Sequence, residues 1–253
     1  MSTTILVTGG TGTLGRPVVE RLRAAGHEVR VLSRSSREYP VDLLTGAGLD
    51  AALAGVEVVV HCASSPKGGD DRAAGHLIRA ARAAGVGHLV YISIVGVDEV
   101  PLPYYRTKYR VERMIEESGL GWTVLRTTQF HDLVLGYFEA VAKLPVLLVP
   151  GGVADQPIEV EEVADRLAGL AGAAPAGRVA DMGGPEVLDM AGAARAYLKA
   201  AGRRRPVLGV RLPGKTFAAF RRGGHLTPAH AVGRGTFAEF LERRTGAGAG
   251  AGA

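Results

Sequence analysis

The sequence contains one cysteine, Cys62, among its 253 residues, so no disulfide can form within the chain. Disulfides are typical of proteins from oxidising compartments, and their exclusion predicts a cytoplasmic protein. The chain also lacks an apolar run long enough to cross a membrane, and no basic and then apolar leader precedes its first apolar segment. We therefore expect no membrane partner.

Lysine is scarce as well: the chain has five lysines and 25 arginines. The chain is also rich in alanine and glycine, and these biases indicate the base composition of the genome rather than a ligand. The formal net charge is +5, but the basic residues are scattered, and the one basic run, residues 203–205, is expected to be a solvated loop. No basic face with interleaved aromatic residues is evident, so we expect no nucleic-acid partner.

The sequence also lacks the patterns of a metal site and of a serine-protease type of catalytic triad. No group of histidine, cysteine and carboxylate residues has the spacing of a metal site, and no Ser-His-Asp set can be assembled. His131 and Asp132 are adjacent, but adjacent side chains on a helix point apart. We expect no bound metal.

What the chain does contain is a glycine-rich turn close to its start. An apolar segment, residues 4–8, runs into the sequence Gly9-Gly10-Thr11-Gly12-Thr13-Leu14-Gly15. Apolar residues then recur at helical spacing, which predicts a buried helix face. Glycine permits a sharp turn and the close approach of a pyrophosphate, and a helix N-terminus offers N–H groups to that anion. The turn predicts a dinucleotide site, with a purely structural tight turn as the alternative.

Strand-like and helix-like segments alternate through the first half of the chain. Short β-rich runs are expected at residues 29–32, 56–61, 89–93 and 122–125, with helices at 16–25, 47–53, 71–84 and 104–118. Near-continuous apolar strands joined by helices predict an α/β fold with a doubly wound parallel sheet. Ligands bind beyond the carboxyl ends of the strands of such sheets.

The rest of the chain predicts a smaller, mostly helical lobe. Helical patterns are expected near residues 160–170, 188–201, 215–222 and 236–244. We therefore predict a nucleotide-binding domain at 1–150, a substrate-side lobe packed on it at 151–244, and a disordered Gly/Ala tail at 245–253, which has nothing to bury.

The residues after the second expected strand indicate the kind of dinucleotide. Ser33 and Arg34 stand where an NAD enzyme would place an acidic residue against the ribose 2′-hydroxyl. Arginine instead pairs with a 2′-phosphate, so this position favours NADP(H), unless Arg34 is an ordinary exposed loop residue. Asp42 is a candidate hydrogen-bond acceptor for the adenine amino group or else a turn aspartate. Small residues in the segment 62–64 fit the path of the adenosine half or a structural loop.

A candidate acid/base pair follows further along the chain. Tyr104 and Lys108 are one helical turn apart and share a face. An ammonium group near a phenol favours the phenolate and brings its pKa toward neutrality, and the same lysine can bind a nicotinamide ribose. Ser93 ends a strand and is a candidate for polarising a substrate oxygen. The alternative is that Tyr104 simply packs against the sheet.

These segments resemble the short-chain dehydrogenase/reductase superfamily and, more narrowly, its atypical NmrA-like, NAD(P)H-binding branch. The resemblance rests on residues 8–15, the Tyr-x-x-x-Lys pair, residues 91–97 and 118–130, the Gln156-Pro157 pair with residues 161–165, and residues 183–187. It implies a Rossmann-type domain holding NADP(H), with a smaller lobe over the nicotinamide.

The resemblance also implies which residues contact the cofactor. Matching by position gives Gly9, Thr11, Gly12, Thr13, Leu14 and Gly15 for the pyrophosphate, Ser33 and Arg34 for the 2′-phosphate, Asp42 and Leu43 for adenine, and Ser64 along the ribose path. Cys62 and Ala63 beside Ser64, and Lys108 for the ribose, complete the set of candidate cofactor residues. Tyr104 and Lys108 match the family's acid/base pair. In many relatives the catalytic serine or threonine lies slightly beyond the position of Ser93, where this chain has Ile94 and Val95.

The sequence as a whole predicts an NADP(H)-dependent oxidoreductase. Hydride would pass between the nicotinamide and a small-molecule substrate, which is a carbonyl, an alcohol or an activated C=C. A non-catalytic NADP(H)-binding sensor or regulator is the competing class, and an epimerase or isomerase with retained cofactor is a third option. Nothing in the sequence marks an oligomeric interface.

Overall fold

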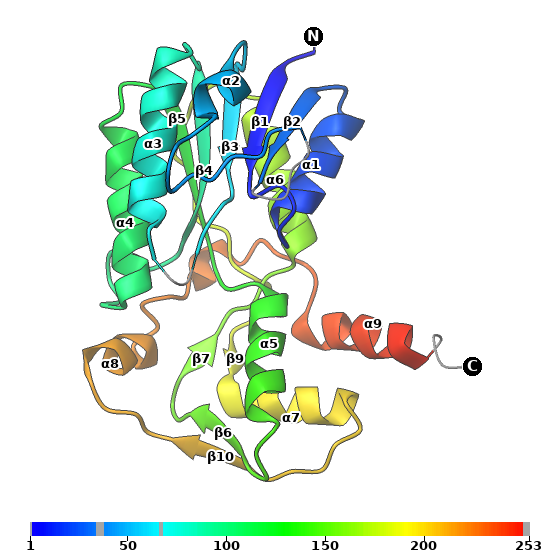
Figure 1. Cartoon of the computed structure of the whole chain (residues 1–253). Coiled ribbons are helices and arrows are strands. Elements are labelled where there is room, and N and C mark those ends of the chain that lie inside the picture. Colours follow the sequence, from blue (N-terminus) through cyan, green and yellow to red (C-terminus); the bar gives the residue numbers. More distant parts are fainter. Residues whose placement is uncertain (1, 34–37, 66–67, 250–253) are drawn as a thin grey trace. The chain divides into compact units, whose positions relative to one another are not determined.

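The computed structural model describes residues 2–33, 38–65 and 68–249 (Figure 1). The chain forms two units that interleave along the sequence. Unit 1 comprises Met1–Asp98, Leu102–Arg126 and Glu161–Ala180; unit 2 comprises Glu99–Pro101, Thr127–Val160 and Asp181–Ala253. Among the described residues, no helix is long and apolar enough to cross a membrane.

Unit 1 is built on a parallel sheet of six strands in the order β2-β1-β3-β4-β5-β8. The strands are β1 (Thr4–Thr8), β2 (Glu28–Leu32), β3 (Val58–His61), β4 (His88–Ile94), β5 (Gly121–Thr127) and β8 (Gly177–Arg178). All four residues of β3 are buried, as expected for a strand covered on both faces. The strand order reverses at β1, so the carboxyl ends of β1 and β3 flank the position where such sheets bind ligands.

Helices cover both faces of this sheet, which confirms the predicted α/β fold class. They are α1 (Gly15–Ala24), α2 (Leu49–Leu53), α3 (Asp70–Ala83), α4 (Pro103–Glu116) and α6 (Val160–Ala171). Figure 1 shows α3 and α4 on one face and α1 with α6 on the other. Arg21 of α1 forms ion pairs with Glu161 and Asp165 of α6, which joins the last two.

Unit 2 combines helices with two small sheets. Its elements are α5 (His131–Val141), β6 (Leu147–Pro150), β7 (Ala154–Asp155), β9 (Leu188–Asp189), α7 (Met190–Ala200), β10 (Val207–Val210), α8 (Lys215–Arg221), a 3-10 turn (Pro228–His230) and α9 (Phe237–Ala249). β6 pairs with β10 in parallel, and β7 pairs with β9 antiparallel. Buried side chains such as Phe138, Leu147, Tyr197 and Phe237 form one apolar core.

The division into units differs from the predicted boundary after residue 150. Residues 127–150 belong to unit 2, whereas α6 belongs almost entirely to unit 1. The helix itself was predicted, but the ion pairs with Arg21 and the pairing of β8 with β5 place this segment on the sheet. These are contacts between residues far apart in the chain, which helical periodicity does not reveal.

The C-terminal segment also differs from its prediction. Helix α9 runs to Ala249 and so includes residues 245–249, which were predicted to be disordered. Alanine is the strongest helix former, but it alternates there with glycine, which opposes a helix by about 1 kcal/mol per residue. The extension of a helix that has already started avoids the cost of nucleation. Residues 250–253 lie outside the described residues.

A buried ion pair anchors α4 on the sheet. Arg126 of β5 donates two hydrogen bonds to the carboxylate of Glu112 on α4, at 2.9 and 2.6 Å, and one to Asp98 at 2.9 Å. The side chains of Arg126 and Glu112 are only 4% and 1% exposed. Because α4 also carries Tyr104 and Lys108, this pair helps to position the candidate site.

Replacing Glu112 with Gln should destabilise the protein by about 3 kcal/mol, because the buried guanidinium loses its main counter-charge. Urea unfolding of the two proteins measures this difference. Glu117→Gln is the matched control, since Glu117 is exposed and pairs with Arg113 at the end of the same helix. The control should cost about 0.5 kcal/mol or less. Equal losses in the two variants would show that the buried pair does not anchor α4.

Candidate functional site

The turn between β1 and α1 is built so closely that side chains do not fit. A Cβ on Gly15 would lie 2.1 Å from the carbonyl oxygen of Gly9, and a Cβ on Gly9 would lie 2.8 Å from the backbone of Ala63. Gly9 has a φ of +67°, a conformation that L side chains rarely adopt. The turn is closed by the N–H of Gly12, which donates to the Gly9 carbonyl at 2.9 Å.

Beyond this turn lies a cleft of about 600 Å³ at the carboxyl ends of β1, β2 and β3. Nine of the predicted cofactor residues line it: Gly9, Thr11, Gly12, Ser33, Asp42, Leu43, Cys62, Ala63 and Ser64. The cleft therefore brings together residues that are up to 55 positions apart, in the place that the sheet topology predicts.

Of the other predicted cofactor residues, the four that the structure describes do not line the cleft. Thr13 is exposed on the turn, whereas Leu14, Gly15 and Lys108 are buried. Arg34 lies outside the described residues. Asp42 lines the cleft and also accepts the N–H of Leu44 at 2.9 Å, so its turn role and its ligand role are compatible in this structure.

A buried hydrogen bond fixes the loop that follows β3. The hydroxyl of Thr8 lies 2.7 Å from Nδ1 of His61 and accepts the N–H of Ala63 at 3.2 Å. Burial, with a further contribution from the charge of Lys108, lowers the pKa of His61 to about 3, so the imidazole is neutral. It stacks on the ring of Tyr91 at 5.3 Å between centroids. The ends of β1 and β3 are thereby held together beside the glycine turn.

Three oxygen atoms form a hydrogen-bonded chain at the edge of the cleft. The hydroxyl of Tyr104 lies 2.7 Å from Oγ of Ser64, which donates to Oδ2 of Asp70 at 2.6 Å. The other oxygen of Asp70 accepts the N–H of Ser65 at 2.8 Å. Asp70 is 6% exposed and begins α3, whose N-terminus favours a carboxylate. Asp70 is not predicted from the sequence, because its spacing from Tyr104 along the chain carries no signal.

This chain determines the direction of the Tyr104 hydrogen bond. Since the Ser64 hydroxyl donates its proton to Asp70, its oxygen accepts from the phenol of Tyr104. Burial raises the pKa of Tyr104; the bond to Ser64 lowers it, and the negative charge of Asp70 raises it further. The net direction is upward, which favours a protonated phenol.

The sequence predicts that Lys108 lowers the pKa of Tyr104, whereas the net shift in the structure is upward. Nζ of Lys108 donates to the carbonyl oxygen of Ile92 at 3.1 Å and lies 4.8 Å from the ring centroid of Tyr91. Tyr104 and Lys108 share a face of α4, but the phenol of Tyr104 bonds to Ser64 and the ammonium group of Lys108 bonds to the Ile92 carbonyl. Burial lowers the pKa of Lys108 to about 8, against the charges of Asp70, Cys62 and Glu112, which raise it.

Ser93 lies in the interior of β4 and is 1% exposed. Its Oγ has no hydrogen-bond partner within the described part of the chain. It follows Ile92, whose carbonyl accepts the Lys108 proton, but it does not line the cleft. Over residues 2–33, 38–65 and 68–249, no group of three or more His, Cys, Asp or Glu residues could hold a metal ion.

Together, the glycine turn, the sheet topology and the cleft define a nucleotide-binding α/β protein. Residues 9–171 match the family described as NAD(P)H-binding, and the chain belongs to this family. The crystal structure of an NADPH-dependent quinone oxidoreductase from Escherichia coli, complexed with NADPH, matches with a TM-score of 0.82 and 22% identity over 95% of this chain and 99% of that one.

Two curated relatives carry different names. The (4-alkanoyl-5-oxo-2,5-dihydrofuran-3-yl)methyl phosphate reductase of Streptomyces griseus is 33% identical over 200 residues, which are 73% of this chain and 69% of that protein. The photosystem II assembly factor Ycf39 of Cyanophora paradoxa is 31% identical over 153 residues, which are 53% of this chain and 48% of that protein. The chain is thus similar to a protein named as a reductase and to one named as an assembly factor.

The pKa of Lys108 predicts a pH dependence of stability. Between about pH 8 and pH 10.4 the folded protein has lost the Lys108 proton while the unfolded chain still holds it, so the free energy of unfolding should rise with pH. The increase that is due to Lys108 should be about 1 kcal/mol per pH unit in this window.

Urea unfolding at several pH values, in the wild type and in Lys108→Met, measures this contribution as the difference between the two proteins. The exposed Lys143→Met is the matched control and should behave as the wild type. If Lys108→Met shows the same pH dependence as the wild type, Lys108 does not titrate in this window.

Proposed function

We propose that this protein is an NADP(H)-dependent oxidoreductase of the NmrA-like branch of the short-chain dehydrogenase/reductase superfamily, and that it acts in the cytoplasm on a small molecule. The observation that carries this proposal is the cleft at the carboxyl ends of β1, β2 and β3, bordered by the glycine turn and by Tyr104 through Ser64. The Streptomyces griseus relative named as a reductase and the NADPH-bound neighbour support it.

The residues of the cleft fit a dinucleotide. The turn at Gly9, Gly12 and Gly15 leaves backbone where side chains would otherwise stand, next to the N-terminus of α1. We assign the pyrophosphate to this turn, the adenine to the side lined by Asp42 and Leu43, and the 2′-phosphate to Ser33 and Arg34. When bound, the nicotinamide supplies or accepts the hydride.

The chain's own residues manage the proton. In the reduction of a carbonyl or an activated C=C, Tyr104 donates its phenolic proton to the substrate. Asp70, acting through Ser64, is a positioning residue that holds the phenol in place, and burial raises the pKa of the phenol. Lys108 anchors α4 to β4 through the Ile92 carbonyl and binds the nicotinamide ribose in this proposal. Ser93, the candidate from the sequence for polarising the substrate oxygen, is buried in β4 and does not line the cleft, so we do not assign it this role.

Replacing Tyr104 with Phe should reduce kcat by about 100-fold or more, because the general acid is lost while the cleft keeps its shape. NADPH oxidation with a panel of quinones, aldehydes and enones measures turnover, and calorimetry measures NADPH affinity, which should change little. Tyr109→Phe is the matched control, since Tyr109 is exposed on the same helix and should retain full activity.

The same experiment tests the competing class, a regulator that binds NADP(H) without turnover. The Cyanophora paradoxa relative named as an assembly factor favours keeping this second candidate. Tight NADPH binding with no turnover by the wild type across the panel would support the regulator. Turnover that survives in Tyr104→Phe would remove Tyr104 as the proton donor. Cofactor retained through purification, without net oxidation of added NADPH, would favour an epimerase or isomerase.

The preference for NADP(H) over NAD(H) depends on Arg34. Replacing Arg34 with Ser should weaken NADPH binding by about 10- to 100-fold and leave NADH binding unchanged, because only the former carries the 2′-phosphate. Parallel calorimetric titrations with NADPH and NADH measure both affinities. Arg37→Ser, three residues further along the sequence, is the control and should keep the wild-type preference. Equal affinities of the wild type for the two coenzymes would contradict the role of Arg34.

A further inference from the structure

Unit 2 contains a long segment whose charges are all of one sign. Residues 190–238 include ten lysines and arginines and no aspartate or glutamate. The rest of the chain carries 20 lysines and arginines against 25 aspartates and glutamates. The net positive charge of the protein therefore comes from this one segment, although the basic residues look scattered when the acidic residues are not considered.

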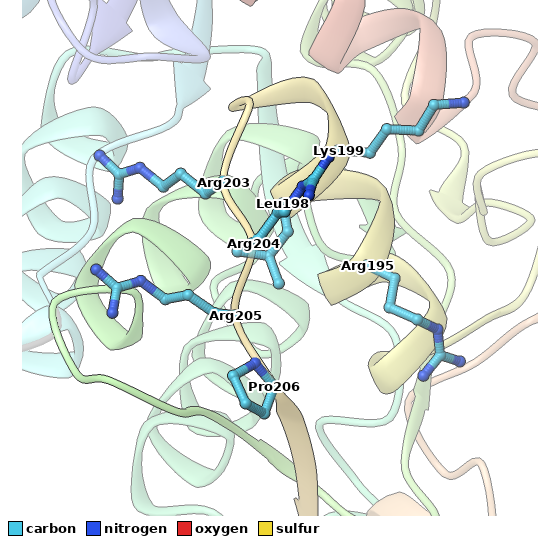
Figure 2. Close-up of a pocket in the computed structure, with 7 residues that line it drawn as sticks. All are labelled: Arg195, Leu198, Lys199, Arg203, Arg204, Arg205 and Pro206. Atoms are coloured by element: carbon cyan, nitrogen blue, oxygen red, sulfur yellow. The ribbon is translucent and has the colours of Figure 1, made fainter.

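Five of these cations lie around one hollow on the surface of unit 2. Its volume is about 530 Å³, and it is lined by Arg195, Leu198, Lys199, Arg203, Arg204, Arg205 and Pro206. Figure 2 shows the side chains of Arg203 and Arg205 extending to the same side of the segment that follows α7. All five cations are exposed. In the part of the chain that the structure describes, none of the five forms a salt bridge, so their charge is not compensated locally.

The basic run leads directly into a ribbon with an exposed apolar face. The N–H of Leu147, at the start of β6, donates to the carbonyl of Pro206 at 2.9 Å, so the two segments are neighbours. In the parallel pairing of β6 and β10, Leu148 lies opposite Leu208. Leu148, Leu208 and Val210 are 38%, 54% and 37% exposed, whereas Leu147 is buried.

The exposed cations together with the exposed aliphatic side chains favour a lipid surface over a nucleic acid as the anionic partner. Single-stranded nucleic acid is bound by cations together with aromatic stacking surfaces, and the exposed residues of this ribbon are aliphatic. Exposed aliphatic side chains next to arginine and lysine are instead typical of proteins that lie at a bilayer interface, where the apolar groups enter the headgroup region and the cations contact lipid phosphates.

We propose that unit 2 docks on the surface of a membrane that contains anionic phospholipids. Leu148, Leu208 and Val210 insert between the headgroups, and Arg203–Arg205 before β10 and Arg211 after it contact the phosphates. The sequence predicts no membrane partner, because it contains no apolar run long enough to span a bilayer. Docking at the surface requires no such segment, and this proposal replaces that expectation. It does not depend on the oxidoreductase activity.

Sedimentation of the full chain with phospholipid vesicles tests the proposal. The protein should bind vesicles of phosphatidylcholine with about one third phosphatidylglycerol at least 10-fold more tightly than vesicles of phosphatidylcholine alone, and salt should weaken this binding. Replacing Arg203, Arg204 and Arg205 together with Ser should weaken binding by about 100-fold. Leu148→Gln with Leu208→Gln should also weaken it, without removing the salt dependence.

The matched control replaces Arg72, Arg79 and Arg82 of α3 with Ser, which removes the same charge from exposed positions of unit 1. This variant should bind vesicles as the wild type does. All variants are checked for an unchanged thermal unfolding midpoint, since the altered residues are exposed.

Several results would overturn the proposal. These are equal binding to neutral and anionic vesicles, an equal loss of binding in the control variant, and binding to a DNA duplex or a single-stranded RNA at the same salt concentration without binding to vesicles. The proposal would also be overturned if Leu148→Gln with Leu208→Gln converted a dimer into a monomer while vesicle binding stayed unchanged. The ribbon of β6 and β10 would then be an interface between two copies of the chain.

Discussion

The close approach of α1 to the end of β1 is the constraint on which the candidate site depends. The carbonyl oxygen of Gly9 lies so near Gly15 that a Cβ there would be 2.1 Å away. The chain consequently turns from strand to helix over a few residues and presents backbone, rather than side chains, at the edge of the cleft. The neutral His61, bonded to Thr8, holds β3 beside this turn. The cleft therefore has a fixed wall of main-chain atoms, which suits an anionic, flat ligand such as a dinucleotide.

The second feature of the site is the way in which charge is distributed around Tyr104. Asp70 at the start of α3 accepts the hydrogen bond of the Ser64 hydroxyl, so the phenol of Tyr104 donates toward Ser64, and burial raises the pKa of that phenol. Lys108 meanwhile contacts the backbone of β4 and the face of Tyr91. A protonated phenol beside the cleft is suited to donating a proton during reduction, and less suited to accepting one during oxidation. The buried pair of Arg126 and Glu112 keeps α4 in register with the sheet, so the stability of the fold and the placement of Tyr104 are linked.

Much of unit 1 could be predicted from the sequence because its signals are local. The glycine turn and the apolar strands are encoded in stretches of a few residues, and the structure has them close to the predicted positions. The lining of the cleft followed from one topological rule about the carboxyl ends of parallel strands.

The predictions that failed or were missing concern contacts between distant segments. The packing of α6 on unit 1 depends on Arg21, which lies 140 residues before Glu161, and no periodicity reports such a pair. Asp70 reaches Tyr104 only through Ser64 and only after the sheet has formed. The spacing of Tyr104 and Lys108 correctly indicated a shared helix face, but the sequence does not show that the Ile92 carbonyl and the ring of Tyr91 take the ammonium group.

The most direct test of the dinucleotide site is a calorimetric titration with NADPH of the wild type, of Gly12→Val and of Gly169→Ala. Gly12 lines the cleft, whereas Gly169 lies in α6 with open space around it. We expect the wild type and Gly169→Ala to bind one NADPH per chain with the same affinity, and Gly12→Val to bind at least about 10-fold more weakly, since a side chain then stands where the pyrophosphate approaches. Absence of binding to the wild type, or undiminished binding to Gly12→Val, would contradict a dinucleotide site at this turn.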